Sequence, residues 1–279
     1  MNVHPSSPIG VFDSGLGGLS VVEQLRTELP RESIQYGADS RFCPYGQRSL
    51  AEIRTRSEAM VGHLVECGAK LVIVACNTAS AAATEVLRER FPVPIVALEP
   101  AVKPAVALTR SGKIAVLATQ STAASPRLHA LIERYGSGFD IRPIGVPGLA
   151  DRVEEGDFDG PAVYDLLADR VRSQVADGVD VIVLGCTHYP FARGVIQELA
   201  GPDVRIVDSG NAVARRAREV MVQAGLLRGL GAAPTLDVRT TGDPVAVQPI
   251  VGRMLGQVID VTALCEQEPA MPVQLTTMA

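Results

Sequence analysis

The sequence has few cysteines and histidines, and none of them is spaced as a metal or redox motif. Its five cysteines are scattered, with no Cys-x-x-Cys pair, and its four histidines show no metal-ligand spacing. This argues against a disulfide framework and against a zinc site built on thiolates. We therefore predict no metal site, and free thiols used for packing or chemistry in a reducing compartment.

Long apolar runs and dense basic clusters are also absent. No apolar run reaches transmembrane length, and residues 1–8 lack the apolar core of a signal peptide. The net charge is −5, from 26 Lys and Arg against 31 Asp and Glu. Nucleic acid and anionic membranes are therefore poor partners. These absences predict a cytoplasmic protein with neither a nucleic-acid nor a membrane partner.

Two stretches of the chain share one pattern. Residues 71–80 and 181–190 each begin with a short apolar run rich in β-branched residues, which predicts a strand buried on both faces. Each run ends at a cysteine, Cys76 or Cys186, followed by small polar residues. In open parallel sheets this carboxyl edge is where ligands bind.

Either cysteine alone would be interpreted as a small buried residue at a sheet edge, because free cysteine is among the most buried residue types. The polar residues after Cys76 and Cys186 can instead cap a helix or hold a ligand. A thiol near a helix amino terminus also tends towards thiolate. The repeated pattern favours two facing halves that each contribute a thiol to one cleft.

The remaining sequence alternates between predicted strands and helices. With 279 residues and 47% hydrophobic residues, one large or two medium domains are expected. Residues 9–14 resemble residues 114–119 at an offset of 105 positions, and the two cysteine stretches resemble each other at an offset of 110. We predict an α/β fold of two similar doubly wound parallel-sheet lobes with the active site in the cleft between them.

A glycine-rich turn, Asp13 to Gly18, follows the first predicted strand. An apolar stripe from Leu19 to Leu29 predicts a helix directly after it. The turn does not match the dinucleotide fingerprint, whose third glycine comes later, so no nucleotide site is predicted. Its glycines suit a tight turn and expose N–H groups that could bind a carboxylate. Asp13 can cap this helix or act in catalysis, and the sequence leaves both open.

Four segments resemble the signature segments of the glutamate racemase family, in the same order. They are residues 12–20, 44–46, 75–79 and 185–190, within a resemblance that covers about residues 9 to 262. The resemblance implies a cofactor-independent enzyme with two doubly wound lobes and an active site between them. It also implies that the last segment returns to the first lobe.

The resemblance and the composition together predict the domain boundaries. The first lobe is expected to comprise residues 1–98 and 212–265, and the second lobe residues 99–211. Residues 266–279 show no periodicity and are expected to form a mobile tail.

Inverting the α-carbon of an amino acid without pyridoxal phosphate requires two acid/base groups on opposite sides of that carbon, and facing thiols supply them. One cysteine must start as thiolate and the other as thiol, so nearby donors should lower a thiol pKa. By resemblance, Cys76 acts on one antipode and Cys186 on the other. Asp13 would assist Cys76, and His188 would assist Cys186.

The resemblance also implies substrate-binding and auxiliary positions. Glu154 resembles an auxiliary acidic residue, although a solvated charge is the alternative and the register with Glu155 is open. Cys43, before Pro44, is interpreted as a non-catalytic loop variation. The substrate's ammonium and carboxylates would be held by eight residues, each of which could also serve turn or cap chemistry: Asp13, Ser14, Tyr45, Gly46, Asn77, Thr78, Thr187 and His188.

Three alternatives remain at the sequence level. An aspartate racemase or maleate isomerase would share the two thiols, but such relatives tend to carry glutamate where this chain has His188. A two-lobed binding protein would not need matched thiols, and a cysteine hydrolase would leave one thiol idle. The resemblance favours glutamate racemisation that supplies D-glutamate for peptidoglycan, and thus for cell wall biogenesis and cell shape. A homodimer is expected because two-fold dimers are the commonest oligomers.

Overall fold

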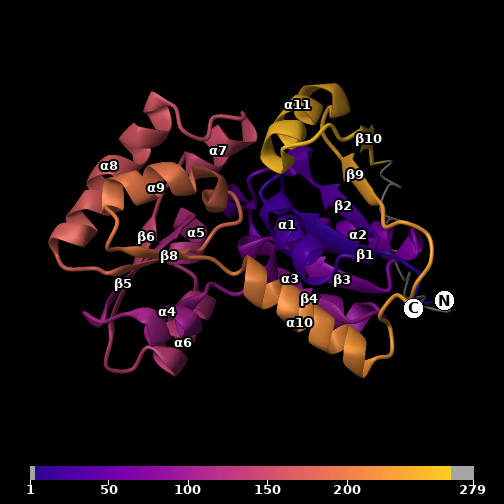
Figure 1. The fold of residues 1–279 in the computed structure, drawn as a ribbon, viewed down its shortest axis with the longest axis horizontal. Coiled ribbons are helices and arrows are strands. Elements are labelled where there is room, and N and C mark those ends of the chain that lie inside the picture. Colours follow the sequence, from indigo (N-terminus) through magenta and orange to yellow (C-terminus); the bar gives the residue numbers. More distant parts are fainter. Residues whose placement is uncertain (1–3, 265–279) are drawn as a thin grey trace, which may run out of the picture.

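A computed structural model describes residues 4–264. They form two α/β lobes, each with a parallel sheet, that lie side by side (Figure 1). The first lobe contains a six-stranded sheet in the order β10-β9-β2-β1-β3-β4, and the second a four-stranded sheet in the order β6-β5-β7-β8. Every strand pair is parallel. The predicted fold class is confirmed. The expected tail lies outside the described residues.

The first sheet combines strands from both ends of the described chain. Its strands are β1 (Ile9–Asp13), β2 (Ile34–Ala38), β3 (Leu71–Val74), β4 (Ile95–Ala97), β9 (Leu236–Thr240) and β10 (Val261–Ala263). Helices α1 (Leu19–Glu28), α10 (Gly210–Gln223) and α11 (Pro244–Leu255) share one core with this sheet, and α2 (Leu50–Glu66) and α3 (Asn77–Arg90) share another. Two 3₁₀ turns, η1 (Ser40–Phe42) and η2 (Tyr45–Gln47), follow β2.

The second sheet is built from the middle of the chain. Its strands are β5 (Lys113–Ala118), β6 (Asp140–Gly145), β7 (Val181–Leu184) and β8 (Arg205–Val207). Helices α7 (Leu149–Glu154), α8 (Pro161–Ala176) and α9 (Arg193–Ala200) pack in one core, and α4 (Val102–Leu108) and α6 (Pro126–Tyr135) in the other. The short α5 (Gln120–Ala123) follows β5, and the 3₁₀ turn η3 (Tyr189–Ala192) precedes α9.

Local sequence explains why these elements begin and alternate as they do. Along β3, Leu71 and Ile73 enter one core while Val72 and Val74 enter the other, so this strand is buried on both faces. Helix α2 begins after Ser49, whose hydroxyl accepts the N–H of Glu52 while the Glu52 carboxylate accepts the N–H of Ser49.

The short helix α7 has no clear signal in the sequence. Residues 149–154 form it after Gly148, which has a φ of 85°. Leu149, Ala150 and Val153 are buried. Six residues are too few to show a helical period, so tertiary packing decides this conformation.

The strand registers place the functional segments at one edge of each sheet. In the β1–β3 pair Phe12 lies beside Val74, so Asp13 ends near the start of the Cys76 segment. In the β5–β7 pair Leu117 lies beside Leu184, which brings the residues after Ala118 next to Cys186. These carboxyl edges are where doubly wound sheets bind ligands. None of the helices within residues 4–264 has both the length and the apolarity to cross a membrane.

Candidate active site

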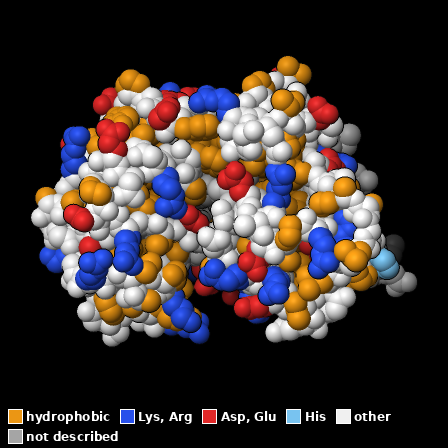
Figure 2. Space-filling view, in the orientation of Figure 1, with side chains coloured by type: hydrophobic (Ala, Val, Ile, Leu, Met, Phe, Trp, Pro, Cys, Tyr) orange, Lys and Arg blue, Asp and Glu red, His pale blue; other side chains and the backbone are white. Residues whose placement is uncertain are grey.

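A small pocket lies where the two lobes meet. The lobes face each other across a notch in the space-filling view (Figure 2). Nine residues predicted for the site line this pocket: Ser14, Tyr45, Gly46, Cys76, Asn77, Thr78, Cys186, Thr187 and His188. Asp13 and Glu154 lie behind this lining and contact it through hydrogen bonds. The structure therefore brings the two cysteines into one cleft.

The pocket also has lining residues that were not predicted from the sequence. They are Pro44, Thr119, Thr122, Ala150 and Gly185. Thr119 had a usable signal, because the internal repeat aligns it with Ser14, which lines the same pocket from the other lobe. Ala150 belongs to the helix that the sequence did not predict.

Cys76 is the N-cap residue of α3. Its Sγ accepts the N–H of Ala79 at 3.5 Å, and its thiol donates to the Ser14 hydroxyl at 3.5 Å. Burial raises the pKa of the Cys76 thiol well above its ordinary value, and the nearby Asp13 charge raises it further. The hydrogen bonds with Ala79 and Ser14 lower this pKa, as expected of neighbouring donors, but desolvation outweighs them.

Asp13 joins the two lobes at the centre of the site. Its carboxylate accepts the N–H groups of Ser14 at 2.8 Å and Gly18 at 2.6 Å, and the Thr187 hydroxyl at 3.1 Å. The side chain is fully buried, and burial raises the pKa of the Asp13 carboxyl. Asp13 thus organises the turn before α1 and also reaches the segment that carries Cys186.

Cys186, His188 and Glu154 form a chain of contacts on the other side. The Cys186 Sγ lies 3.6 Å from His188 Nδ1, and His188 Nε2 lies 2.5 Å from Glu154 Oε1. Leu16, from the first lobe, donates its N–H to the same Oε1 at 2.5 Å. Glu155 instead pairs with Arg152, and both of these side chains are exposed. Of the two acidic residues, only Glu154 contacts the site.

The protonation of His188 is set by its partners. Burial alone would lower the pKa of His188, but hydrogen bonds with the Cys186 and Cys43 thiols and with Glu154 raise it well above its ordinary value. These hydrogen bonds therefore favour the protonated imidazole beside Cys186. This is the arrangement expected of a group that delivers protons to a thiolate.

Cys43 lies beside the site, directly before the segment that carries the predicted site residues Tyr45 and Gly46. A ring nitrogen of His188 lies within 4.8 Å of the Cys43 Sγ, and burial raises the pKa of Cys43 to about 12. The prediction that Cys43 is non-catalytic is compatible with this position, because the thiol stays protonated and does not line the pocket.

Gly17 is needed for the close approach of His188. A Cβ at position 17 would overlap the imidazole, lying 2.7 Å from His188 Cγ. We expect Gly17→Ala to displace His188 and to lower kcat by up to about a hundredfold, the effect of a misplacement near 1 Å. Steady-state assays of the amino-acid inversion that the resemblance implies check this. Gly194→Ala is the matched control, since a Cβ there meets no described atom within 4 Å, and an equal loss in both variants would contradict the prediction.

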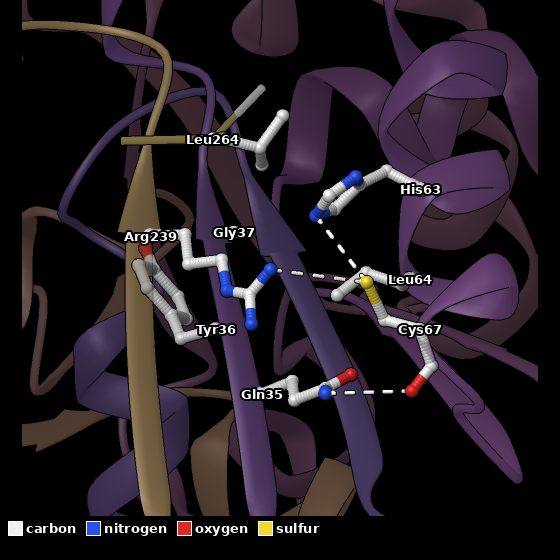
Figure 3. Close-up of a pocket in the computed structure, with 8 residues that line it drawn as sticks. All are labelled: Gln35, Tyr36, Gly37, His63, Leu64, Cys67, Arg239 and Leu264. Atoms are coloured by element: carbon white, nitrogen blue, oxygen red, sulfur yellow. Dashed lines mark hydrogen bonds between the residues drawn. The ribbon is translucent and has the colours of Figure 1, made fainter. Parts of the chain in front are cut away.

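A second pocket lies away from this site, between α2 and the strands β2 and β9 (Figure 3). Cys67 Sγ lies 3.6 Å from His63 Nε2 and accepts a contact from Arg239 Nη1 at 3.9 Å. The lining contains none of the residues predicted for catalysis or substrate binding. Cys67 therefore lies outside the candidate active site.

Comparison with known proteins identifies the family. A model of the Asp/Glu/Hydantoin racemase family matches residues 9–217. A glutamate racemase from Herpetosiphon aurantiacus is 45% identical over 237 residues, covering 85% of this chain and 93% of the relative. A glutamate racemase isoform from Bacillus anthracis superposes with a TM-score of 0.83 at 32% identity, covering 95% of this chain and 99% of that chain.

A structure of Escherichia coli glutamate racemase in complex with L-glutamate and the activator UDP-MurNAc-Ala is also similar. It has a TM-score of 0.81 and 31% identity, covering 92% of this chain and 97% of that chain. The fold and the family match define an isomerase of the Asp/Glu/Hydantoin racemase class. Within that class, the chain belongs to the glutamate racemase family.

Proposed function

We propose that this enzyme interconverts L- and D-glutamate by a two-base mechanism in which Cys76 and Cys186 act on opposite faces of the α-carbon. The observation that carries the mechanism is the placement of both thiols on one pocket between the lobes. One thiolate removes the α-proton, and the other thiol delivers a proton to the opposite face. No step requires a cofactor.

Each thiol has its own proton-exchanging neighbours. Cys186 contacts His188, which Glu154 orients through Nε2, so His188 returns a proton to the Cys186 thiolate between turnovers. Cys76 lies beside Ser14, which hydrogen bonds to Asp13. Asp13 is assigned to assist Cys76 in the same way.

The substrate is held by the polar residues of the pocket. The side-chain oxygen of Asn77 is buried and has no hydrogen-bond partner within the described chain, so it is available to accept from the substrate ammonium. In the structure the hydroxyls of Ser14 and Thr187 donate to Asp13 and that of Tyr45 donates to Asp39, so these three donors would change partner when the substrate carboxylates bind. Five further residues are assigned to the two carboxylates. They are Ser14, Tyr45, Gly46, Thr78 and Thr187.

Incubation with L-glutamate in D₂O, without added cofactor, tests this function. The circular dichroism signal of L-glutamate should disappear as the racemate forms. Proton NMR should show deuterium replacing the α-proton of glutamate. L-Aspartate run in parallel should show neither change. Exchange with aspartate alone would overturn the substrate assignment, and no exchange with either amino acid would overturn the proposed reaction.

The Asp13 charge predicts a measurable change at Cys76. A carboxylate close to a thiolate disfavours the charged thiol, so Asp13→Asn should lower the pKa of Cys76 while turnover falls. The onset of iodoacetamide alkylation at Cys76, followed by peptide mass spectrometry, should therefore move to lower pH. Asp140→Asn, a change at an exposed carboxylate paired with Arg142, is the control. An unchanged or higher onset in Asp13→Asn would contradict the prediction.

The cellular assignments follow from the family and are proposed with it. D-Glutamate made by this reaction would supply peptidoglycan synthesis, and thereby cell wall biogenesis and cell shape. The enzyme is assigned to the cytoplasm, where such a precursor is needed, and to a homodimer, the commonest symmetric assembly. Sedimentation of the purified protein tests the dimer.

A further inference from the structure

Three donor groups of different chemistry converge beside the active site. One ligand atom each from Cys43, Glu154 and His188 lies within 4.8 Å of the other two. Cys43 comes from the loop before η2, Glu154 from the end of α7, and His188 from the segment after β7. Because the three residues lie on three separate segments, their spacing in the sequence gave no metal signal.

This donor set matches a borderline divalent cation. A thiolate, an imidazole and a carboxylate are the ligands that Zn²⁺ and Co²⁺ accept, and three protein ligands leave a fourth position for water. The charges also balance, because a thiolate and a carboxylate neutralise a divalent ion. The carboxylate of Glu154 is 17% exposed, which leaves a route for an ion to enter from solvent.

Groups around the three donors already hold them in orientation. The N–H of Leu16 fixes Glu154 Oε1, and the Cys186 thiol contacts the Nδ1 of His188, leaving Nε2 to face the cluster. Such outer contacts orient metal ligands in known sites. Gly15 makes the convergence possible, since a Cβ there would lie 2.7 Å from the Cys43 Sγ and would overlap the Glu154 carboxylate.

We propose that Cys43, Glu154 and His188 form an inhibitory binding site for Zn²⁺ or a cation of similar chemistry. Binding forms bonds from the ion to Cys43 Sγ, a Glu154 oxygen and His188 Nε2. It releases to solvent the proton of the Cys43 thiol and the proton held between His188 Nε2 and Glu154. No oxidant or reductant is involved.

Inhibition rests on the proposed function, because it requires that His188 serve Cys186. An imidazole bound to a cation through Nε2 keeps its other proton on Nδ1 and can no longer become an imidazolium. It therefore cannot take up and return protons for the Cys186 thiol. The ion would stop racemisation without entering the substrate pocket.

Cobalt titration tests binding separately from catalysis. Reduced, chelator-treated enzyme titrated with CoCl₂ should develop a thiolate-to-cobalt charge-transfer band that saturates at one ion per chain. Cys43→Ser should lose the band, and Cys67→Ser, which removes a thiol from the second pocket, should keep it. An unchanged band in Cys43→Ser, or no band in the wild-type enzyme, would overturn the site. Glu154→Gln, which retains every thiol, should weaken cobalt binding at least about tenfold, a loss typical even of outer-shell partners.

Zinc titration tests inhibition. ZnCl₂ should inhibit glutamate racemisation by the wild-type enzyme, and a chelator should restore it. The Zn²⁺ concentration for half-inhibition should rise at least about tenfold in Cys43→Ser. Equal sensitivity of the two proteins would overturn the inhibitory role. The wild-type enzyme could bind cobalt when titrated and yet fail to racemise glutamate after chelator treatment. That result would support the metal site but refute the proposed function.

Discussion

Alanine at Cys76 or at Cys186 is expected to lower the rate of glutamate inversion by orders of magnitude. Both thiols line one pocket, and the proposed reaction needs one on each face of the α-carbon. Each substitution should lower kcat for racemisation by roughly a hundred- to ten-thousand-fold, the contribution of a positioned acid/base group. The remaining background would come from binding and from the surviving thiol.

The two variants should differ in proton exchange, which separates a two-base mechanism from a single-base one. A surviving thiol can remove the α-proton of one antipode and return solvent deuterium to the same face. Each variant should therefore exchange one antipode of glutamate in D₂O without inverting it, and the two variants should exchange opposite antipodes. Proton NMR with pure L- and D-glutamate measures this directly.

Cys67→Ala is the matched control for these experiments, because its thiol contacts His63 just as the Cys186 thiol contacts His188. It should retain wild-type inversion and exchange, since Cys67 lies in the second pocket. Exchange of the same antipode by both active-site variants would contradict the assignment of one thiol to each face. Inversion by either variant at the wild-type rate would refute the two-base mechanism.

The fold could be predicted from local sequence because its signals are local. The apolar runs before Cys76 and Cys186 need no distant partner to indicate buried strands, and both are strands with the cysteine just beyond the carboxyl end. The exact domain boundaries stay predictions. The sheets show only which strands belong to each lobe, with β9 and β10 in the first. The helix around Val153 was missed because it depends on packing rather than on propensity.

The immediate contacts of the site were only partly predictable. Signature segments indicated Cys186 and His188, but no local rule links either residue to Cys43, which the fold brings to the same imidazole. The net direction of the Cys76 pKa shift was not predictable either, because sequence shows the donors around a thiol but not how completely it is buried. Burial and long-range contacts are properties of the whole fold, and they decide the electrostatics of the site.

Removing Glu32 is expected to cause the largest loss of stability among the predicted changes. Lys70 is fully buried, and its ammonium donates to Glu32 at 2.5 Å and to the Pro5 carbonyl at 2.6 Å. Burial lowers the pKa of Lys70, and the Glu32 carboxylate opposes that shift. Glu32→Ala leaves the ammonium buried without its counter-charge. The free energy of unfolding should therefore fall by about 3–5 kcal/mol.

The pH dependence of this loss has a defined sign. Without Glu32 the pKa of Lys70 in the folded enzyme falls further, while in the unfolded chain it stays near its usual value of about 10.4. Between these two values the unfolded state binds more protons, so the stability of Glu32→Ala should rise with pH in this range. Urea unfolding at neutral and alkaline pH measures the effect, and the deficit relative to the wild-type enzyme should shrink as Lys70 loses its proton.

Two further variants decide whether the buried charge is the cause. Glu58→Ala removes the Arg90–Glu58 pair, in which the arginine is 63% exposed, and should cost at most about 1 kcal/mol. The double variant Glu32→Leu/Lys70→Met removes both buried charges and should recover part of the stability lost in Glu32→Ala. A single Glu32→Ala loss no larger than that of Glu58→Ala would show that the buried ion pair does not stabilise the first lobe. A double variant less stable than Glu32→Ala would show that packing, rather than the unpaired ammonium, sets the loss.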